Sequence, residues 1–295
     1  MKILLFGKNG QVGWELQRSL APLGELVALD RASQDWCGDL TDLDSIARTI
    51  RAVAPTVIVN AAAYTAVDRA ESEPALCHTV NCLAPGVMAA EAKALSAWMV
   101  HYSTDYVFDG SGSRPWTEGD TPAPINVYGR TKAEGEQRIA AACARHLLLR
   151  TSWVYADRGG NFIRTMLRLG QERERLSVVD DQHGAPTGAE LIADVTAHAL
   201  RSALQHDGLA GTYHLVPHGD TSWHGYAQHI LATAREAGRP VKAALEAVPS
   251  SAYPTAALRP HNSRLNNHKL EQAFGLRLPP WQPGVERVLA GWATP

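Results

Sequence analysis

A short apolar run at the start of the chain leads through a glycine turn directly into a helical segment. The apolar run is Lys2–Phe6. Gly7, Gly10 and Gly13 follow it at three-residue spacing, and residues 14–20 have helical character. Glycines allow a tight turn and close backbone approach to a pyrophosphate, while a helix N-terminus offers free N–H groups to phosphates. The segment predicts a strand–turn–helix unit that binds a dinucleotide. Glycines that serve only a sharp turn would produce the same spacing.

Strand-like and helical runs alternate through the first half of the chain. We expect further strands at 25–29, 56–60, 98–103 and 146–150, and helices at 85–95 and 126–143. This alternation predicts an α/β fold, a Rossmann-type doubly wound parallel sheet with ligands at the carboxyl ends of its strands. We therefore expect residues 1–150 to form an NAD(P)-binding Rossmann domain.

The second half of the chain is less regular. Helices are expected at 161–170, 189–204 and 222–236, and a strand at 212–216. Prolines become frequent after Pro240, which suggests ordered loops. Thr187, with Glu190 three residues on, has the pattern of a helix N-cap. We expect residues 151–295 to form mainly a smaller, mixed α/β substrate-binding lobe, with elements from about 189–216 joining the first domain.

Composition limits the kind of protein this is. The 295 residues are 45% apolar and 20% charged, and the net charge is −2, which gives no general electrostatic reason to bind nucleic acid or anionic membranes. We find neither a signal-peptide core nor an apolar stretch of about 18 residues, so we expect a cytoplasmic location. The four cysteines have no C-x-x-C spacing and the histidines no H-E-x-x-H pattern, so we expect packing roles for the cysteines and no catalytic metal.

Tyr128 and Lys132 are spaced four residues apart in an expected helix, and Ser103 and Thr104 lie between them and the glycine turn in the sequence. Residues i and i+4 share one face of a helix, so the phenol and the ammonium would emerge side by side. A nearby cation stabilises a phenolate, and together these residues suggest a hydride-transfer site. The pair alone also fits a solvated lysine above a half-buried tyrosine.

The end of the second expected strand carries Asp30, where an acidic side chain would meet the adenosine ribose of a dinucleotide. Arg31 follows it directly. Aspartate favours a free 2′-hydroxyl and arginine favours a 2′-phosphate, so Asp30 and Arg31 together do not distinguish NADH from NADPH.

Several motifs together resemble the extended short-chain dehydrogenase/reductases, in order from Lys2 to about Trp281. They are Gly7-x-x-Gly10-x-x-Gly13, the stretches 60–68, 103–110 and 181–190, Tyr128-x-x-x-Lys132, and Arg259-Pro260-x-Asn262-Ser263. The resemblance implies an NAD(P)H-dependent oxidoreductase that reduces the C4 keto group of dTDP-4-dehydro-β-L-rhamnose to dTDP-L-rhamnose, a precursor in polysaccharide synthesis. It also implies that Tyr128 donates the proton, that Lys132 lowers the phenol pKa and orients the nicotinamide ribose, and that Thr104 hydrogen-bonds the C4 oxygen.

The same resemblance assigns the binding residues. The residues expected to bind NADPH or NADH include Tyr128 and Lys132. The pyrophosphate is expected to contact Gly7, Gly10, Gln11, Val12 and Gly13, and the adenosine Asp30, Arg31, Asp39 and Leu40. The nicotinamide half is expected to contact Ala63, Tyr64, Thr65 and Tyr102. The residues expected to bind the dTDP-sugar are Thr104, Asp105, Trp153, Arg259 and Asn262. From the residues alone, Asp39 fits a turn equally well, and Asp105 and Asn262 fit roles in pinning loops.

Some relatives bind Mg²⁺ between subunits through acidic residues that include one near the C-terminus. Residues 288–295 contain no carboxylate side chain, and Glu190 alone cannot make that site. A metal-bridged dimer is therefore not expected, while another homodimer or a monomer stays open.

Two other functions fit the same fold. One is a nucleotide-sugar epimerase or dehydratase that keeps its NAD, although dehydratases of this fold usually have Glu where this chain has Tyr106 after Thr104-Asp105. The other is a non-catalytic regulatory relative, which need not retain Tyr128 and Lys132. The intact catalytic set favours the reductase over both.

Overall fold

The computed structural model describes residues 1–292 and contains a six-stranded sheet in the order β10-β5-β4-β3-β1-β2. All neighbouring strands in it are parallel. Every residue of β3 and β4 is buried, because helices cover both faces of a doubly wound sheet. The strands are β1 (Lys2–Phe6), β2 (Glu25–Leu29), β3 (Val57–Asn60), β4 (Trp98–Thr104), β5 (His146–Thr151) and β10 (Gly211–His214).

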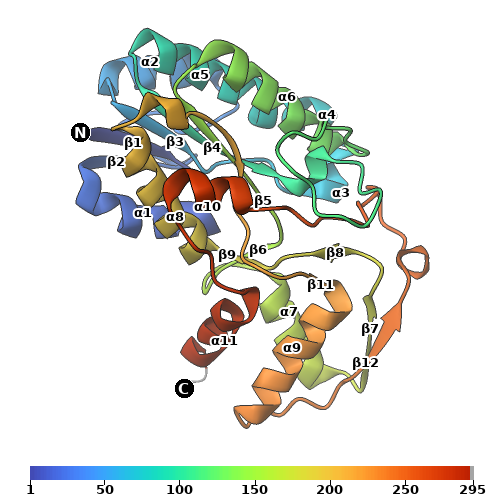
Figure 1. Ribbon diagram of the computed structural model, residues 1–295. Helices are drawn as coiled ribbons and strands as arrows, with labels where there is room; N and C mark the ends of the chain where they lie inside the picture. Colours follow the sequence, from blue (N-terminus) through green and yellow to red (C-terminus); the bar gives the residue numbers. More distant parts are fainter. Residues whose placement is uncertain (293–295) are drawn as a thin grey trace.

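Helices cover the two faces of this sheet (Figure 1). On one face α1 (Gln11–Leu20), α8 (Ala189–Ala203) and α10 (His268–Phe274) share an apolar core with one side of the strands. On the other face α2 (Leu43–Val53), α5 (Ala84–Ala94) and α6 (Val127–Ala142) form a second core. The Rossmann-type fold that the alternating pattern predicts is confirmed. Strand β10 and helix α8 come from the second half of the chain, while the domain boundary at residue 150 stays a prediction.

A third apolar core lies in the smaller lobe, between α7 (Phe162–Glu172), α9 (Trp223–Glu236) and α11 (Trp281–Gly291), below the large sheet in Figure 1. Three two-stranded pairs complete the lobe: β12 (Ala244–Val248) with β7 (Arg175–Val179), β6 (Val154–Tyr155) with β9 (Thr187–Gly188), and β8 (His183–Gly184) with β11 (Thr221–Ser222). The remaining short helical elements are η1 (Ala21–Leu23), α3 (Val67–Ala70), α4 (Pro74–His78), the π-helical turn η2 (Thr79–Leu83), η3 (Asp105–Val107), η4 (Asp207–Leu209) and η5 (Ser250–Ala252).

Two local predictions are wrong. The proline-rich part after Pro240 is not only loops, since it contains β12, α10 and α11. Pro283 lies in the first turn of α11, where its missing N–H breaks no helical hydrogen bond. The N-cap of α8 is Gly188 rather than Thr187, whose hydroxyl instead donates to the Ala185 carbonyl at 3.1 Å.

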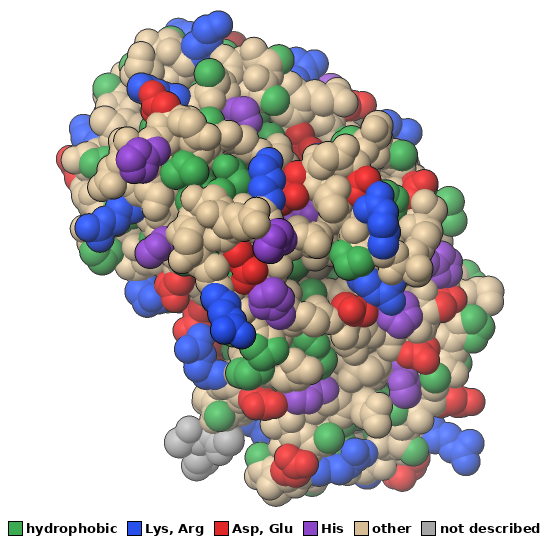
Figure 2. Space-filling model, in the orientation of Figure 1, with side chains coloured by type: hydrophobic (Ala, Val, Ile, Leu, Met, Phe, Trp, Pro, Cys, Tyr) green, Lys and Arg blue, Asp and Glu red, His purple; other side chains and the backbone are tan. Residues whose placement is uncertain are grey.

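The surface agrees with the small net charge. On the face shown in Figure 2, acidic and basic side chains are interspersed rather than gathered by sign. Among residues 1–292, no helix has both the length and the apolar character needed to cross a bilayer.

Candidate active site

The glycine turn lies where the strand order changes direction, with β1 placed between β2 and β3. Ligands of open α/β sheets bind at the carboxyl ends of the strands at such a point. Gly7 has a backbone φ of +88°, which favours glycine, and a Cβ on Gly13 would lie only 2.0 Å from the Gly7 carbonyl oxygen. Gly10 caps α1 without a side chain, so the first N–H groups of the helix, from Gln11, Val12 and Gly13, are available to an anion. This cradle fits a dinucleotide pyrophosphate.

Asp30 is held rigidly at the end of β2. Its carboxylate accepts hydrogen bonds from the Ser33 hydroxyl at 2.9 Å, from the Ala32 N–H at 3.1 Å and from the Asn9 side chain. The hydrogen bond from Ser33 is the main cause that lowers its pKa. The carboxylate therefore stays charged at neutral pH and is presented to the crevice as an acceptor.

Arg31 and Asp39 pair with each other. The Arg31 Nε lies 3.1 Å from the Asp39 Oδ2, and the Arg31 side chain is 82% exposed. Asp39 also accepts from the Thr41 N–H at 3.0 Å, which is the turn role that the residues alone allowed. Leu40 beside it is buried in the second core.

The segment after β3 is fixed by an asparagine that sequence reasoning did not select. Asn81, buried in η2, accepts the Tyr64 N–H at 2.9 Å and donates to the Tyr64 carbonyl at 3.0 Å. The Tyr64 hydroxyl donates to Glu73 at 2.5 Å. Ala63 is half-buried beside it and Thr65 is exposed. Asn81 lies in a helix interior with no nearby motif, so the sequence carried no local signal for it.

Tyr128 is the second residue of α6 and is half-buried. Asn126 is the N-cap of the helix, and its side chain accepts the Gly129 N–H at 2.7 Å and so fixes where the phenol emerges. Thr104, at the end of β4, lies near enough to the phenol to lower its pKa, against the larger effect of burial. The structure thus brings Thr104 and Tyr128 together, although they are far apart in the sequence.

Lys132 is buried one helical turn after Tyr128, and its contacts differ from the expected ones. Its Nζ donates to the Tyr102 carbonyl at 2.6 Å and lies 3.1 Å from Nε2 of His101. Burial lowers the pKa of Lys132 to about 8, and burial also raises the pKa of Tyr128. Burial is the largest influence on the Tyr128 pKa, and the lowering of that pKa by Lys132 stays a prediction.

Tyr102 contributes its backbone rather than its ring to this arrangement. Its hydroxyl hydrogen-bonds Thr196 of α8 at 2.8 Å, on the opposite side of the sheet from α6. Side chains alternate along a strand, so only the Tyr102 carbonyl faces Lys132.

Asp105 lies directly after Thr104 and is 2% exposed. Its Oδ1 accepts the Thr104 hydroxyl at 3.0 Å, while its Oδ2 has no hydrogen-bond partner in the described chain. Burial raises the pKa of Asp105 to about 6. An unpartnered buried carboxylate oxygen carries a desolvation cost that a ligand hydroxyl would relieve.

Trp153 packs against the core of the smaller lobe, whereas Arg259 contacts a helix of the first half of the chain. Trp153 has a backbone φ of +47° and stacks on Trp223 with ring centroids 3.8 Å apart. Arg259 forms two hydrogen bonds to Asp68, at 3.1 and 2.8 Å, and so ties its segment to α3.

Asn262 is 2% exposed and holds a loop in place. Its side-chain amide donates to the Arg114 carbonyl at 2.8 Å and to the Ser111 carbonyl at 3.2 Å. These contacts match the loop-pinning role that the residues alone allowed.

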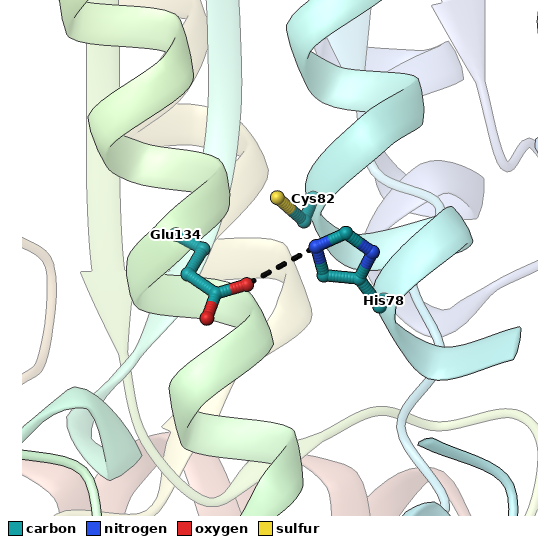
Figure 3. Close-up of side chains that lie close together, drawn as sticks. All are labelled: His78, Cys82 and Glu134. Atoms are coloured by element: carbon teal, nitrogen blue, oxygen red, sulfur yellow. Dashed lines mark ion pairs between the residues drawn. The ribbon is translucent and has the colours of Figure 1, made fainter. Parts of the chain in front are cut away.

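One group of metal-ligating side chains occurs in residues 1–292, outside the glycine crevice: His78, Cys82 and Glu134 (Figure 3). His78 and Glu134 are 3.2 Å apart and form the ion pair drawn there. Arg138 donates its Nε–H to the Cys82 sulfur at 3.1 Å. Its guanidinium places a positive charge where a metal cation would bind, so we assign no metal to this group.

Glu190 borders a pocket of about 510 Å³ between α1, α8 and α11, which Tyr128 and Lys132 do not line. Its carboxylate accepts from Arg287. Arg18 pairs with Asp194 at 2.8 Å and with Glu15 at 3.4 Å. Arginines therefore neutralise these carboxylates. The sequence segment 288–295 has no carboxylate side chain, and its residues 293–295 lie outside the described residues.

Comparison with known proteins supplies the family. Residues 1–293 match the family model described as RmlD substrate binding domain. The chain is 57% identical to the dTDP-4-dehydrorhamnose reductase of Escherichia coli (strain K12) over 98% of this chain and 97% of that one. It is 49% identical to the dTDP-4-dehydrorhamnose reductase of Burkholderia thailandensis over 97% of each chain. The solved dTDP-4-dehydrorhamnose reductase of Bacillus anthracis in complex with NADP superposes with a TM-score of 0.88 at 33% identity, over 98% of this chain and 99% of that one.

Proposed function

The chain belongs to the family of the dTDP-4-dehydrorhamnose reductases, and we propose that it carries out their reaction, the NAD(P)H-dependent reduction of the C4 keto group of dTDP-4-dehydro-β-L-rhamnose. The observation that carries this proposal is the convergence of Thr104, Tyr128 and Lys132 at the carboxyl edge of the sheet, beside the glycine cradle. The product, dTDP-L-rhamnose, is a precursor in polysaccharide synthesis.

NADPH or NADH supplies the hydride when bound. The glycine cradle and the first N–H groups of α1 hold the pyrophosphate, and Asp30, Arg31, Asp39 and Leu40 form the adenosine side. The segment 63–65 and the Tyr102 backbone border the nicotinamide side. Lys132, one helical turn after Tyr128 and bonded to the Tyr102 carbonyl, would donate a remaining N–H to a ribose hydroxyl.

Tyr128 is the proton donor in this proposal. The Thr104 hydroxyl turns its one O–H from the Asp105 carboxylate to the C4 oxygen of the sugar as negative charge develops there, and the Tyr128 phenol gives that oxygen its proton. Asp105 accepts a sugar hydroxyl through its unpartnered Oδ2. Trp153 and Arg259 contact the dTDP-sugar, Arg259 by exchanging part of its pairing with Asp68 for the diphosphate, and Asn262 holds the adjoining loop.

The assay for this proposal follows the absorbance of the reduced nicotinamide. We expect added NADPH or NADH to be oxidised in proportion to the dTDP-4-dehydrorhamnose supplied, and separate runs with each cofactor give the preference. Turnover of a nucleotide sugar without net oxidation of added cofactor would instead show an epimerase or dehydratase with resident NAD. No turnover together with tight cofactor binding would favour the regulatory relative. Homodimerisation stays a prediction.

Thr104→Val is expected to lower turnover by about tenfold with little change in cofactor affinity. The substitution keeps the shape of the side chain and removes one hydrogen bond that strengthens in the transition state, and a loss of about 1.4 kcal/mol is a factor of ten. Stopped-flow hydride transfer measures the step directly. Because Thr104 also bonds Asp105 and the Tyr106 N–H, thermal unfolding is measured in parallel. Hydride transfer at the wild-type rate would contradict the assigned role.

A further inference from the structure

The segment that carries Arg259 and the first turn of α6 are joined by one side-chain amide. Asn126, the N-cap of α6, is 5% exposed. Its Oδ1 accepts the Gly129 N–H at 2.7 Å, and its Nδ2 donates to the Leu258 carbonyl at 2.7 Å. An amide that turned over would lose both hydrogen bonds, because its oxygen only accepts and its nitrogen only donates. The two contacts therefore fix the orientation of the amide.

Both partners of this amide are next to residues of the proposed reaction. The Gly129 N–H belongs to the peptide group that follows Tyr128, the proposed proton donor. The Leu258 carbonyl belongs to the peptide group that precedes Arg259, the proposed ligand of the diphosphate. Asn126 thus connects the two backbone positions from which the phenol and the guanidinium extend.

The stretch around Leu258 belongs to no helix or strand, and the Leu258 side chain is 70% exposed, so polar contacts hold this segment. The Ala257 N–H donates to the Asp68 Oδ1 at 3.1 Å, and Arg259 makes its two hydrogen bonds to the same carboxylate. In the proposed function Arg259 exchanges part of this pairing for the diphosphate. The hydrogen bond from Asn126 takes no part in that exchange and keeps the segment on α6.

The first turn of α6 has a further contact, with α3. The Val127 N–H donates to the Glu71 carboxylate at 2.8 Å, and Glu71 is the C-cap of α3. The first turn of α3 also carries Asp68, which holds Arg259. The start of α6 and the segment therefore both rest on α3, and Asn126 links them to each other.

A second connection between Arg259 and Tyr128 runs through Tyr106. The Tyr106 ring packs edge-on against Tyr128, with centroids 5.6 Å apart. The hydrogen bonds to Asp68 raise the pKa of Arg259 most, and Tyr106 acts in the same direction, so it lies near the guanidinium. This contact involves an aromatic ring and not the cap of α6. Substitution of Asn126 leaves the ring in place and tests the amide alone.

We propose that Asn126 is a positioning residue that couples the binding of a nucleoside diphosphate at Arg259 to the placement of the Tyr128 phenol. This deepens the proposed function, on which its catalytic meaning rests. A diphosphate bound to Arg259 anchors the segment to the substrate, and the amide transmits this constraint to the first turn of α6. The phenol is then held in register with the sugar carbonyl at the other end of the same substrate.

The test measures amide hydrogen exchange at Gly129 by ¹⁵N NMR, with and without dTDP, which lacks the sugar that Tyr128 would contact. In the wild type we expect saturating dTDP to slow this exchange by about tenfold, within the usual range of coupling between two sites. In Asn126→Ser the hydroxyl still caps the helix but is too short to reach the Leu258 carbonyl. Exchange at Gly129 should then no longer respond to dTDP, while calorimetry shows that dTDP still binds.

Two further variants make the result decisive. Asn126→Asp keeps the size and the cap, but at about pH 8 its carboxylate only accepts hydrogen bonds, so it should lose the response as well. It carries the test if Asn126→Ser does not fold. Asn161→Ser is the matched control, because Asn161 caps α7 by accepting the Arg164 N–H at 3.1 Å and donates to the Ala156 carbonyl at 2.7 Å. It should keep the wild-type response at Gly129.

Turnover separates a positioning role from helix capping. In Asn126→Ser we expect kcat to fall by about tenfold, the effect of one hydrogen bond lost at the transition state. The KM for the sugar should change little, because Arg259 still binds the diphosphate, and the affinity for NADPH should be unchanged. A residue that only caps the helix would lower the temperature of unfolding without this difference between kcat and KM.

The inference is overturned if exchange at Gly129 still responds to dTDP in whichever of Asn126→Ser and Asn126→Asp folds, since the coupling would then run through Tyr106. Loss of the response in Asn161→Ser, no response in a wild type that binds dTDP, or wild-type kcat in Asn126→Ser would also overturn it. A wild type that does not bind dTDP would reject the proposed substrate and the inference with it. A response that depends on Asn126 in a protein without reductase activity would support the link and reject the reaction.

Discussion

Tyr128→Phe is expected to lower turnover by about a hundredfold or more, because one general acid contributes roughly 10²–10⁴-fold to a rate. The substitution removes only the hydroxyl that donates the proton. The ring still packs edge-on against Tyr106, with centroids 5.6 Å apart, so folding and cofactor binding should be retained. Steady-state oxidation of NADPH with saturating sugar measures the loss, and the quenching of protein fluorescence by NADPH measures binding.

A matched control is Tyr213→Phe. The Tyr213 hydroxyl donates to the Leu209 carbonyl at 2.8 Å at the edge strand β10, away from Thr104 and Lys132. Its loss should leave turnover nearly unchanged. If Tyr128→Phe turned over at close to the wild-type rate, or if both variants lost activity equally, Tyr128 would not be the proton donor.

The fold was predictable from the sequence because its signals are local. The first three strands of the parallel sheet are short runs rich in apolar residues, each followed by a helix, and Gly7, Gly10 and Gly13 mark the first turn. Topology then places the carboxyl ends of β1 to β4 at one edge of the sheet, which is why Asp30 and Thr104 lie along the same edge. The predicted fold class and family are confirmed, since the family match extends over residues 1–293.

The contacts of the site were less predictable, because each depends on residues distant in sequence. The sequence suggested that Lys132 acts on Tyr128, but the buried amine contacts Tyr102 and His101 on a strand about thirty residues earlier. Arg259 was expected to bind the dTDP-sugar, and in this structure it pairs with Asp68. Such partners follow from the packing of α3, α6 and β4, and no periodicity or motif encodes them.

The pair of Glu136 and Arg150 shows the same limit, since neither residue belongs to any motif. Arg150 of β5 reaches Glu136 of α6 through two hydrogen bonds, from Nε at 2.9 Å and from a terminal nitrogen at 2.6 Å. The two side chains are 6% and 7% exposed. The Arg150 guanidinium also lies 5.1 Å above the Phe108 ring, so it joins α6 to the segment that follows Asp105.

Arg150→Met is expected to destabilise the protein by about 3–5 kcal/mol, because it leaves Glu136 buried without a counter-charge. Denaturation in urea, followed by tryptophan fluorescence, measures the change. Arg168→Met is the matched control, since Arg168 pairs with Glu172 at 2.8 Å but the two are 60% and 53% exposed, and such pairs contribute about 0–1 kcal/mol.

The double variant Arg150→Met with Glu136→Gln separates the cost of the unpaired charge from the value of the pair. Because the glutamine side chain carries no charge, we expect the double variant to recover a substantial part of the stability that Arg150→Met loses. Equal losses in Arg150→Met and Arg168→Met would show that burial does not govern the effect. A double variant less stable than Arg150→Met would show that packing of the arginine side chain, and not the orphaned carboxylate, dominates at this junction between β5 and α6.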